Sequence, residues 1–370
     1  MSKVKLGEVA IEHKETCKGS KDGYPIVGLE HLVPEEVTLT AWDEGNDNTF
    51  TKMFRKGNVL FGRRRAYLKK AAVAPFDGIC SGDITVIEAI PDRILPELLP
   101  FIIQNDDLFD FAVGKSAGSL SPRVKWEHLK NYEFELPDME KQRELAELLW
   151  AMDATKKSYQ KLIAATDELV KSQFMEQFVI ETPYERTRLG DHISQIRGVS
   201  YKPADLRPSL SEESVLLLRA NNISAGRINH DEVQYVAKEK VSIVQLIQAG
   251  DILMCASSGS LEHVGKAAIC LPSIEGETFG AFCKLIRPKG DLLPEYIAAY
   301  LETDEYREII MQLACGSNIN NLKTEHIDEL QIPAPPAEVQ EAFVSFLRQS
   351  DKSKFAVLSC SNWNLNISKS

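Results

Sequence analysis

The sequence predicts an α+β protein in which two homologous domains, each a mixed sheet with helices, are separated by long helices. Three observations predict this fold class. Short motifs recur in the two halves, β-like runs precede a helical stretch in each half, and residues 140–178 contain neither Gly nor Pro. The length of 370 residues also favours two domains over one.

The internal repeat comes first, because it organises the whole chain. Copies of each motif follow one another in the same order, and from the Leu-Pro-Glu motif onward their spacing stays constant. The matched positions are Leu6-Gly7 with Leu189-Gly190, Gly57-Asn58-Val59-Leu60 with Gly250-Asp251-Ile252-Leu253, Leu95-Pro96-Glu97 with Leu293-Pro294-Glu295, Lys125 with Lys323, His128 with His326, and Gln142 with Gln340.

Each half also repeats one order of elements. Short strands separated by Gly, Pro and Asn come first, then a helical stretch, a loop closed by proline, and a helix. The helical stretches are expected at residues 95–112 and 293–313. We divide the chain into a first globular domain (1–138), a central helix (139–180), a second globular domain (181–335) and a C-terminal helix with a tail (336–370).

The central helix carries apolar residues near heptad spacing, so it needs a partner helix. The stripe comprises Leu145, Leu149, Met152, Tyr159, Ile163, Thr166, Val170 and Phe174, and Leu148, Leu162 and Leu169 widen it. Val339, Phe343, Phe346 and Leu347 mark the helix after Pro336 as that partner. At 1.5 Å per residue the central segment would form a rod of about 60 Å, which would hold the two halves at a set distance. Residues 359–370 are Ser/Asn-rich and aperiodic, so the partner helix is expected to stop near Leu358.

The charge distribution excludes a protein that is basic all over, because the formal net charge is −11. A nucleic-acid role would therefore need locally concentrated positive charge. Residues 51–76 provide it with eight basic residues and no acidic one: Lys52, Arg55, Lys56, Arg63, Arg64, Arg65, Lys69 and Lys70. Neither a long apolar run nor the apolar core of a signal peptide is present, so we expect a cytoplasmic protein without membrane contact.

Four repeated features together resemble the specificity subunits of type I restriction–modification systems. They are the Leu-Gly opening of each half, the Gly-Asn/Asp-Val/Ile-Leu strand, the loop at residues 118–123 with its echo at 316–321, and the proline-plus-Gln helix start at 137–142 and 335–340. Each feature alone is weak, but their duplicated order is specific and spans nearly the whole chain.

The resemblance implies two target-recognition domains, each reading one half of a split, asymmetric double-stranded DNA site. It implies that the two long helices pair as an antiparallel coiled coil that docks two methyltransferase subunits, with restriction/translocase subunits joining the assembly. S-adenosylmethionine, ATP and magnesium would bind those partner subunits, so this chain is expected to hold no cofactor and no catalytic residue. The stripe residues Leu145, Leu149, Met152, Tyr159, Ile163, Val170, Phe343 and Leu347 would form the coiled coil and docking region.

Lys and Arg at phosphates dominate affinity for DNA, and Arg can also grip a guanine edge with two hydrogen bonds. The candidates in the basic run are Arg63, Arg64, Arg65, Lys69 and Lys70. If this run is a strand, only alternate residues would face DNA. A solvated basic surface is the structural alternative.

Two equivalent loops supply further DNA-binding candidates, because Ser, Asn and Lys bond phosphates or adenine edges. They contain Lys115, Ser119, Arg123 and Lys125 in the first half, and Asn318, Asn320, Asn321 and Lys323 in the second. Plain turns, where Gly, Asn and Ser are common, are the alternative. Weaker candidates are Arg219, Asn221, Asn222, Ser257 and Ser258.

Other chemistries have little support in the sequence. The seven cysteines form no C-x-x-C and are expected to be buried, reduced thiols. His128 and His326 occupy equivalent positions, which favours a repeated structural contact over a metal site. Gly114-Lys115-Ser116 lacks the upstream glycine of a phosphate loop, since Phe109 stands there.

Three alternatives to a type I specificity subunit remain open. A single-chain nuclease or methyltransferase would be an enzyme acting alone. A coiled-coil adaptor for proteins would leave the basic run without a purpose. The specificity subunit of a related type II system could have the same sequence features.

Overall fold

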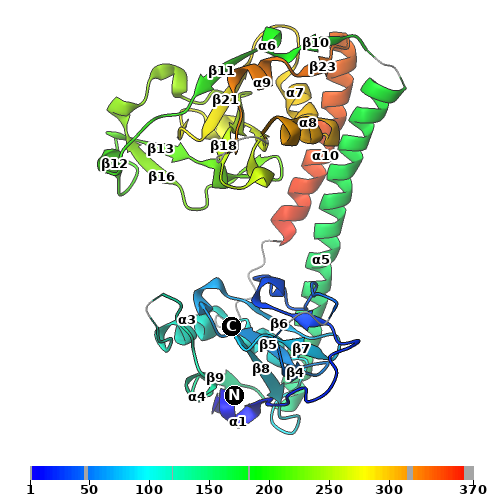
Figure 1. Ribbon diagram of the computed structural model, residues 1–370, viewed down its shortest axis with the longest axis vertical. Helices are drawn as coiled ribbons and strands as arrows, with labels where there is room; N and C mark the ends of the chain where they lie inside the picture. Colours follow the sequence, from blue (N-terminus) through cyan, green and yellow to red (C-terminus); the bar gives the residue numbers. More distant parts are fainter. Residues whose placement is uncertain (1, 46–48, 119, 182–183, 315–319, 362–370) are drawn as a thin grey trace. The chain divides into compact units, whose positions relative to one another are not determined.

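The computed structural model describes residues 2–45, 49–118, 120–181, 184–314 and 320–361, which divide into two compact units (Figure 1). The first unit runs to Gln160, and the second covers Lys161–Ser359. A single helix, α5 (Met139–Met175), begins in the first unit and ends in the second. None of the described helices combines the length and hydropathy that a bilayer crossing requires.

A four-stranded antiparallel sheet in the order β2-β8-β5-β6 organises the first unit. A three-stranded sheet has the order β3-β7-β4, with β3 and β7 parallel, and β1 pairs with β9. The strands are β1 (Ser2–Lys5), β2 (Ala10–Glu12), β3 (Ile26–Val27), β4 (Lys52–Phe54), β5 (Val59–Gly62), β6 (Ala71–Val73), β7 (Gly78–Cys80), β8 (Ile84–Ala89) and β9 (Glu133–Leu136). The helices are α1 (Leu6–Val9), α2 (Leu99–Ile103), α3 (Asp106–Gly114) and α4 (Trp126–Leu129), with 3-10 turns η1 (Leu29–His31) and η2 (Ala66–Leu68).

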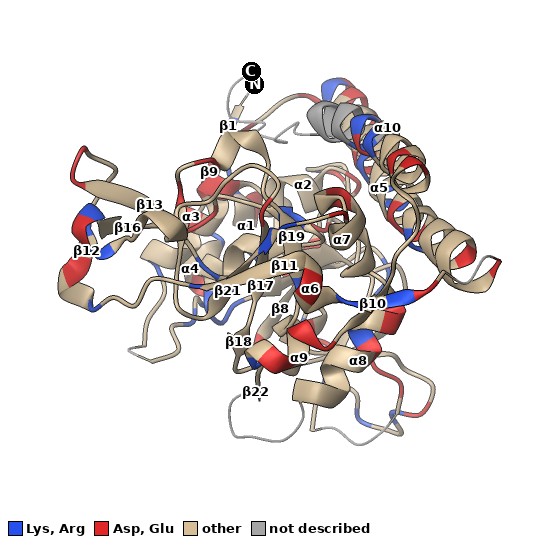
Figure 2. Cartoon of the chain, turned by 90° about the horizontal axis from the view of Figure 1, so that it is seen from above, with Lys and Arg blue, Asp and Glu red and all other residues tan. Residues whose placement is uncertain are grey.

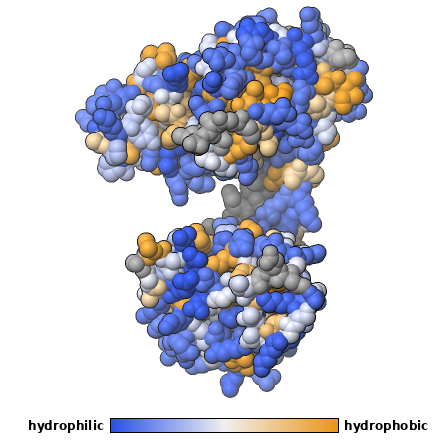
Figure 3. All heavy atoms as spheres, in the orientation of Figure 1, coloured by the Kyte–Doolittle hydropathy of each residue, from blue (hydrophilic) through white to orange (hydrophobic). Residues whose placement is uncertain are grey.

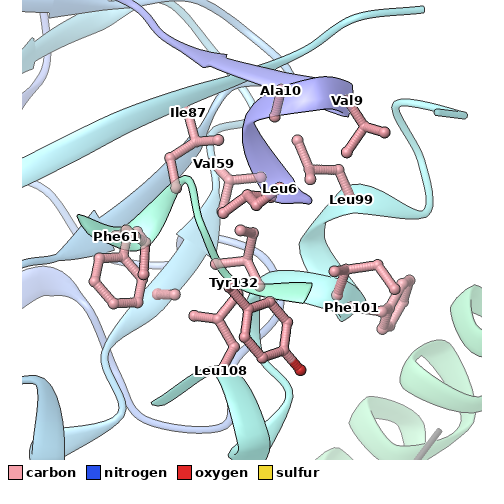
Figure 4. Close-up of a cluster of buried hydrophobic side chains, with 14 of the residues drawn as sticks. Leu6, Val9, Ala10, Val59, Phe61, Ile87, Leu99, Phe101, Leu108 and Tyr132 are labelled. Carbon is pink, nitrogen blue, oxygen red and sulfur yellow. The ribbon is translucent and has the colours of Figure 1, made fainter. Parts of the chain in front are cut away.

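The core of the first unit lies between this sheet and the short helices. Side chains from α1, β5, α2 and α3 converge there, as Figure 4 shows for Leu6, Val59, Leu99 and Leu108. Phe61 stacks on Phe109 with ring centroids 5.5 Å apart. Alternate apolar residues of the strands face the helices. The residues between them, such as Leu60 and Val86, form a second buried cluster with Val27 and Phe54 of the three-stranded sheet, so the four-stranded sheet is covered on both faces.

The second unit repeats this plan. Its sheet β11-β21-β17-β19 has the same connectivity as β2-β8-β5-β6, and β13 and β20 form the parallel pair that β3 and β7 form in the first unit. The strands are β10 (Arg186–Arg188), β11 (Ile193–Arg197), β12 (Leu206–Arg207), β13 (Ser214–Leu218), β14 (Ile223–Ser224), β15 (Arg227–Ile228), β16 (Gln234–Ala237), β17 (Ile252–Cys255), β18 (Ser257–Ser258), β19 (Ala267–Ile269), β20 (Thr278–Phe279), β21 (Cys283–Pro288), β22 (Asn320–Asn321) and β23 (Gln331–Pro333). The helices are α6 (Leu189–His192), α7 (Pro294–Tyr300), α8 (Asp304–Ala314), α9 (Thr324–Asp328) and α10 (Ala337–Ser361), with turns including η5 (Ala220–Asn222) and η8 (Leu261–His263).

The sequence predicted one helical stretch at residues 95–112 and another at 293–313, but each is two helices. The break after α2 contains Asn105, whose side chain accepts a hydrogen bond from the Asp107 amide at 2.9 Å and caps α3. In the second unit Thr303 separates α7 from α8, and its hydroxyl accepts from the Tyr306 amide at 3.3 Å. A capping side chain inside an apolar run starts a new helix, because it bonds the orphan amides of the first turn.

The repeated Leu-Gly motif holds the start of each unit against its last short helix. The Leu6 amide donates to the Tyr132 carbonyl and the Leu189 amide to the Leu330 carbonyl, at 2.9 and 2.8 Å. A Cβ at Gly190 would lie only 2.7 Å from the Cβ of Asp328. The glycine is therefore required by close approach rather than by backbone conformation.

A buried glutamine explains the repeated helix start. Gln142 accepts from the Leu95 amide at 2.8 Å and donates to the Pro137 carbonyl at 2.9 Å. Gln340 makes the same two bonds in the second unit, to the Leu293 amide and the Pro335 carbonyl, both at 2.9 Å. Each long helix is thus joined to the Leu-Pro-Glu segment, which accounts for the constant spacing between the two motifs.

Helix α10 pairs with the second half of α5 within the second unit, and the two run side by side in Figures 1 and 2. The Phe174 and Phe343 rings pack 5.6 Å apart, and Lys354 forms a 2.5 Å ion pair with Asp167. Contacts pair later residues of one helix with earlier residues of the other, so the helices are antiparallel. The described part of helix α10 runs to Ser361, three residues beyond the predicted stop near Leu358.

The three leucines expected to widen the apolar stripe are exposed instead. Leu148, Leu162 and Leu169 are 57, 53 and 53% exposed. Leu149 lies in the first unit's core, and Val170 packs on the second unit's core. Positions 148, 162 and 169 differ by multiples of seven, so they share one face of the helix. That face lies about 100° around the axis from the face that bears Leu149 and Val170, and it is turned to solvent.

Replacing Gly190 by Val should destabilise the second unit by about 1–3 kcal/mol, because the added side chain overlaps Asp328 and forces α6 away from α9. Chemical denaturation followed by circular dichroism measures the change. The matched control is Gly259→Ala, where a Cβ meets no atom within 4 Å. Equal stability of the Gly190 variant and the parent would contradict the close-packing explanation.

Candidate nucleic-acid interface

Three segments that are distant in sequence meet at the end of the central strand β5 in the first unit. The Arg63 amide donates to the Asp83 carbonyl, and the Val124 amide donates to the Arg63 carbonyl, both at 3.0 Å. The Arg65 amide donates to the Pro122 carbonyl at 2.8 Å. The basic run and the loop at residues 115–125, predicted separately from the sequence, therefore share one surface.

Asp83 holds two arginines of this surface, and we call Arg64, Asp83, Ser121 and Arg123 the Asp83 cluster. The carboxylate accepts from Arg123 Nε at 2.7 Å and from Arg64 Nη1 at 3.4 Å, while Arg64 Nε donates to Ser121 Oγ at 2.5 Å. The Arg123 hydrogen bond holds the pKa of Asp83 below its usual value. Both guanidinium groups are oriented and remain about 40% exposed.

The rest of the run is a protruding turn, so the strand alternation considered from the sequence does not apply. Strand β5 ends at Gly62, and η2 follows with Arg65 and Lys69 in the left-handed conformation on either side (φ 53° and 51°). Arg65 and Tyr67 are exposed there. Non-glycine residues adopt this conformation at a cost, and such positions concentrate at functional sites.

Acidic partners that the sequence analysis missed surround the basic run. Lys69 pairs with Asp106 at 2.5 Å, and Arg55 pairs with both Glu15 and Asp77. Lys70 lies below the turn and donates from Nζ to the Leu29 carbonyl at 2.8 Å. These acids come from distant segments, so a scan of neighbouring residues could not find them.

The second unit has the same arrangement of backbone hydrogen bonds, in which the residue after the central strand is bonded to two distant segments. We call this arrangement the framework, and its side chains differ between the units. The Ala256 amide donates to the Phe282 carbonyl, and the Leu322 amide donates to the Ala256 carbonyl, both at 2.9 Å. Ser257 pairs with Asn321 across β18 and β22, as Arg64 pairs with Arg123. The two predicted groups, Ser257 with Ser258 and the second loop, are thus brought together.

Phe282 takes the place of Asp83 in this framework, and the sequence analysis missed it. Its ring is 69% exposed. Its backbone is fixed, because its carbonyl accepts from the amides of Ala256 and Ser257 at 2.9 and 3.0 Å. Of the predicted loop residues, Asn321 is exposed; Asn318 and, in the first loop, Ser119 lie outside the described residues, as does the side chain of Asn320.

Two of the weaker candidates around residue 220, Arg219 and Asn222, make hydrogen bonds within the second unit. Asn222 is fully buried; its side chain accepts from the Arg219 amide at 2.9 Å and donates to the Asp231 carbonyl at 2.7 Å. In the first unit His31 Nδ1 accepts from the Gly28 amide at 3.0 Å after the equivalent strand. Arg219 is half-buried and donates to the Glu232 carbonyl, whereas Asn221 is exposed.

The remaining predicted lysines are exposed. Lys125 and Lys323 stand at equivalent places, immediately before α4 and α9. Lys115 lies over the Phe111 ring, with Nζ 5.7 Å from the centroid. Figure 2 marks positions of Lys and Arg and of Asp and Glu interspersed along the helices and loops, and hydrophobic residues form scattered patches on the face in Figure 3.

Among the described residues, one group has the spacing of metal ligands: Glu30, His31 and Asp43. His31 Nδ1 already accepts a backbone hydrogen bond, so in the neutral ring Nε2 carries the proton and lacks a free lone pair. This group is a poor metal site. Cys80, Cys255, Cys270 and Cys283 are buried free thiols, and burial raises the pKa of Cys80 and Cys270 to about 12.

The family described as type I restriction modification DNA specificity domain matches residues 1–165 and 219–359. The chain belongs to this family. It is 37% identical over 163 residues to the StySPI specificity subunit of Salmonella potsdam and to the EcoKI specificity subunit of Escherichia coli K12. Each match covers 43% of this chain but only 35% of the relative. The MjaVIII specificity subunit of Methanocaldococcus jannaschii is 21% identical over 88% of this chain and 75% of its own.

Two solved structures share the fold. One, from work on assembly and conformational transition of the type I R-M system, gives a TM-score of 0.51 at 20% identity over 97% of this chain and 92% of its own. The other, the S subunit from M. genitalium, gives 0.51 at 11% identity over 99% and 95%. These likenesses agree with the α+β architecture of repeated domains and long helices predicted from the sequence.

Replacing Asp83 by Ala should loosen the loop at residues 117–124, because Arg123 and Arg64 lose their shared acceptor. We expect amide hydrogen exchange in this loop to accelerate by about tenfold. Since the pKa of Asp83 is lowered on folding, the ion pairs of the Asp83 cluster are intact above about pH 4. They are lost as the pH falls through the lowered pKa of Asp83.

The control for this measurement is Asp77→Ala, which removes an ion pair to Arg55 in the same unit but away from the loop. Unchanged exchange in the loop of the Asp83 variant would show that the backbone bonds alone order it.

Proposed function

We propose that this chain is the DNA sequence-recognition subunit of a type I restriction–modification complex. It would read a bipartite, asymmetric double-stranded DNA site and dock methyltransferase and nuclease/translocase subunits. The observation that carries the proposal is the shared framework. In both units one loop meets the end of the central strand. Both segments contain residues of the types that can bond phosphates and base edges. Family membership supports the same assignment.

The chain would contribute recognition and no catalysis. S-adenosylmethionine, ATP and magnesium would bind the partner subunits, two of which would be methyltransferases, and the complex would work in the cytoplasm. Lys125 and Lys323 would supply equivalent phosphate contacts, because both are exposed beside the framework. A protein-only adaptor would leave the framework's cationic and amide side chains without a ligand. The specificity subunit of a related type II system would use this chain in the same way.

Partner docking would fall to exposed residues of α5. The predicted coiled-coil residues Leu149, Val170, Phe343 and Leu347 pack on the cores of their units, and Leu145 packs on the first. Met152, Tyr159 and Ile163 are half-buried. The exposed large apolar side chains on this helix are Leu148, Leu162 and Leu169.

The test of recognition is co-expression with the methyltransferase partner, followed by mapping of modified bases on genomic DNA. We expect a split, asymmetric motif that disappears without this chain. In purified complex, Lys125→Gln and Lys323→Gln should each weaken binding for all sequences and reduce the salt slope by about one. A complex that modifies no defined motif would contradict the proposal.

The test of docking is the double variant Leu162→Asp with Leu169→Asp. Both side chains are exposed, so the free energy of unfolding should change by less than about 1 kcal/mol. Co-purification of the methyltransferase should fall at least about tenfold, because charges would enter an apolar contact. Lys161→Glu, at an exposed position of the same helix, controls for charge alone. Undiminished co-purification would place the docking surface elsewhere.

A further inference from the structure

The shared framework identifies which side chains can differ in DNA reading between the units. Backbone hydrogen bonds align Arg63 with Ala256, and the strand pairings then align Arg64 with Ser257 and Arg123 with Asn321. The same bonds align Asp83 with Phe282. Lys125 and Lys323 are identical and cannot distinguish the units, whereas these four pairs change charge and chemistry.

The first unit presents two oriented guanidinium groups. Arg123 binds Asp83 through Nε and Nη2, and Arg64 uses Nε for Ser121 and Nη1 for Asp83. Among the described residues, Arg123 Nη1 and Arg64 Nη2 donate to no acceptor, and both side chains are partly exposed. Guanine offers two acceptors, O6 and N7, in the major groove, and arginine is the residue that matches them. Asp83 fixes the orientation, so little rotamer freedom is lost on contact.

The second unit presents no cation at the places equivalent to Arg63, Arg64 and Arg123. Asn321 is exposed, and an asparagine amide matches the donor and acceptor on the adenine edge. Phe282 offers an apolar ring on a backbone held by two hydrogen bonds and followed by the buried Cys283. The thymine C5-methyl group is the apolar feature of the major groove. An aromatic ring in place of a carboxylate therefore suits an A·T pair.

We infer that the two units read half-sites of different base composition. The first unit selects a G·C pair through Arg64 and Arg123, and the second selects an A·T pair through Phe282 and Asn321. This inference rests on the proposed function and specifies the class of DNA that each unit takes.

The experiment uses the complex of this chain with its methyltransferase partner and begins from the mapped motif. Duplexes carrying each single base-pair change compete for binding to the parent complex and to two variants, Arg64→Lys and Phe282→Ala. Arg64→Lys keeps the charge but removes the planar fork. It should reduce discrimination at a G·C pair of one half-site by about tenfold and leave the other half-site unchanged.

Phe282→Ala should reduce discrimination at an A·T pair of the other half-site at least about fivefold. Its fold is not at risk, because the ring is mostly exposed. Ile243→Ala is the matched control, since it removes another exposed apolar side chain of the same unit. Arg93→Lys, the same substitution at an exposed position of the first unit, is the control for Arg64→Lys.

The outcomes separate the two proposals. A defined motif whose half-site preferences move as stated supports the inference. A defined motif in which Arg64→Lys changes no G·C pair, or Phe282→Ala changes no A·T pair, overturns it and leaves the recognition function standing. Absence of any sequence preference in the parent complex overturns both.

Discussion

Both units depend on the residue that follows the central strand, Arg63 after β5 and Ala256 after β17. Its amide and its carbonyl are each bonded to a different distant segment, at 2.9–3.0 Å. Backbone groups at the end of a buried strand must find partners, because leaving one unpaired costs about 1–3 kcal/mol. Hydrogen bonds between main-chain groups therefore fix the positions of the two loops, whatever side chains the loops carry. That arrangement leaves the neighbouring side chains free to differ, and in the two units they do.

The sequence predicted the architecture well because each repeated motif encodes a contact. Gly190 allows α6 to approach α9, and Gln142 and Gln340 each bond a helix start to a distant amide. Each of these contacts requires the same residue type in both units, so the same residue occurs at equivalent positions of the two halves. Outside the Gly-Asn/Asp-Val/Ile-Leu motif, the strands need only apolar residues on their buried faces, and most of those residues differ between the halves. The repeat was therefore visible in the motifs whose residues make these contacts, and the order of those motifs was enough to divide the chain.

The site was only partly predictable, for physical reasons. The loops and the basic run were found through residue types that bond DNA, but Asp83 and Phe282 follow other strands and join the site only through tertiary hydrogen bonds. The protruding turn with Arg65 and Lys69 in left-handed conformations has no signature in a sequence of cations. Asn222 was singled out by type, yet its position after a parallel strand makes it a buried capping residue, like His31. The type of a residue indicates whether its side chain could bond DNA, but only the fold determines whether that side chain is exposed.

The acids that surround the basic run reconcile a net charge of −11 with the proposed DNA-binding surface. Arg55 is paired with Glu15 and Asp77, Lys69 with Asp106, and Arg64 with Asp83. Each pairing reduces the cation's attraction for phosphates in general, which weakens non-specific binding. A paired arginine also keeps donors that point in a fixed direction, and a base edge can satisfy them without reorganising the side chain. Since specificity is the difference between the two affinities, the same carboxylates that lower total attraction increase discrimination.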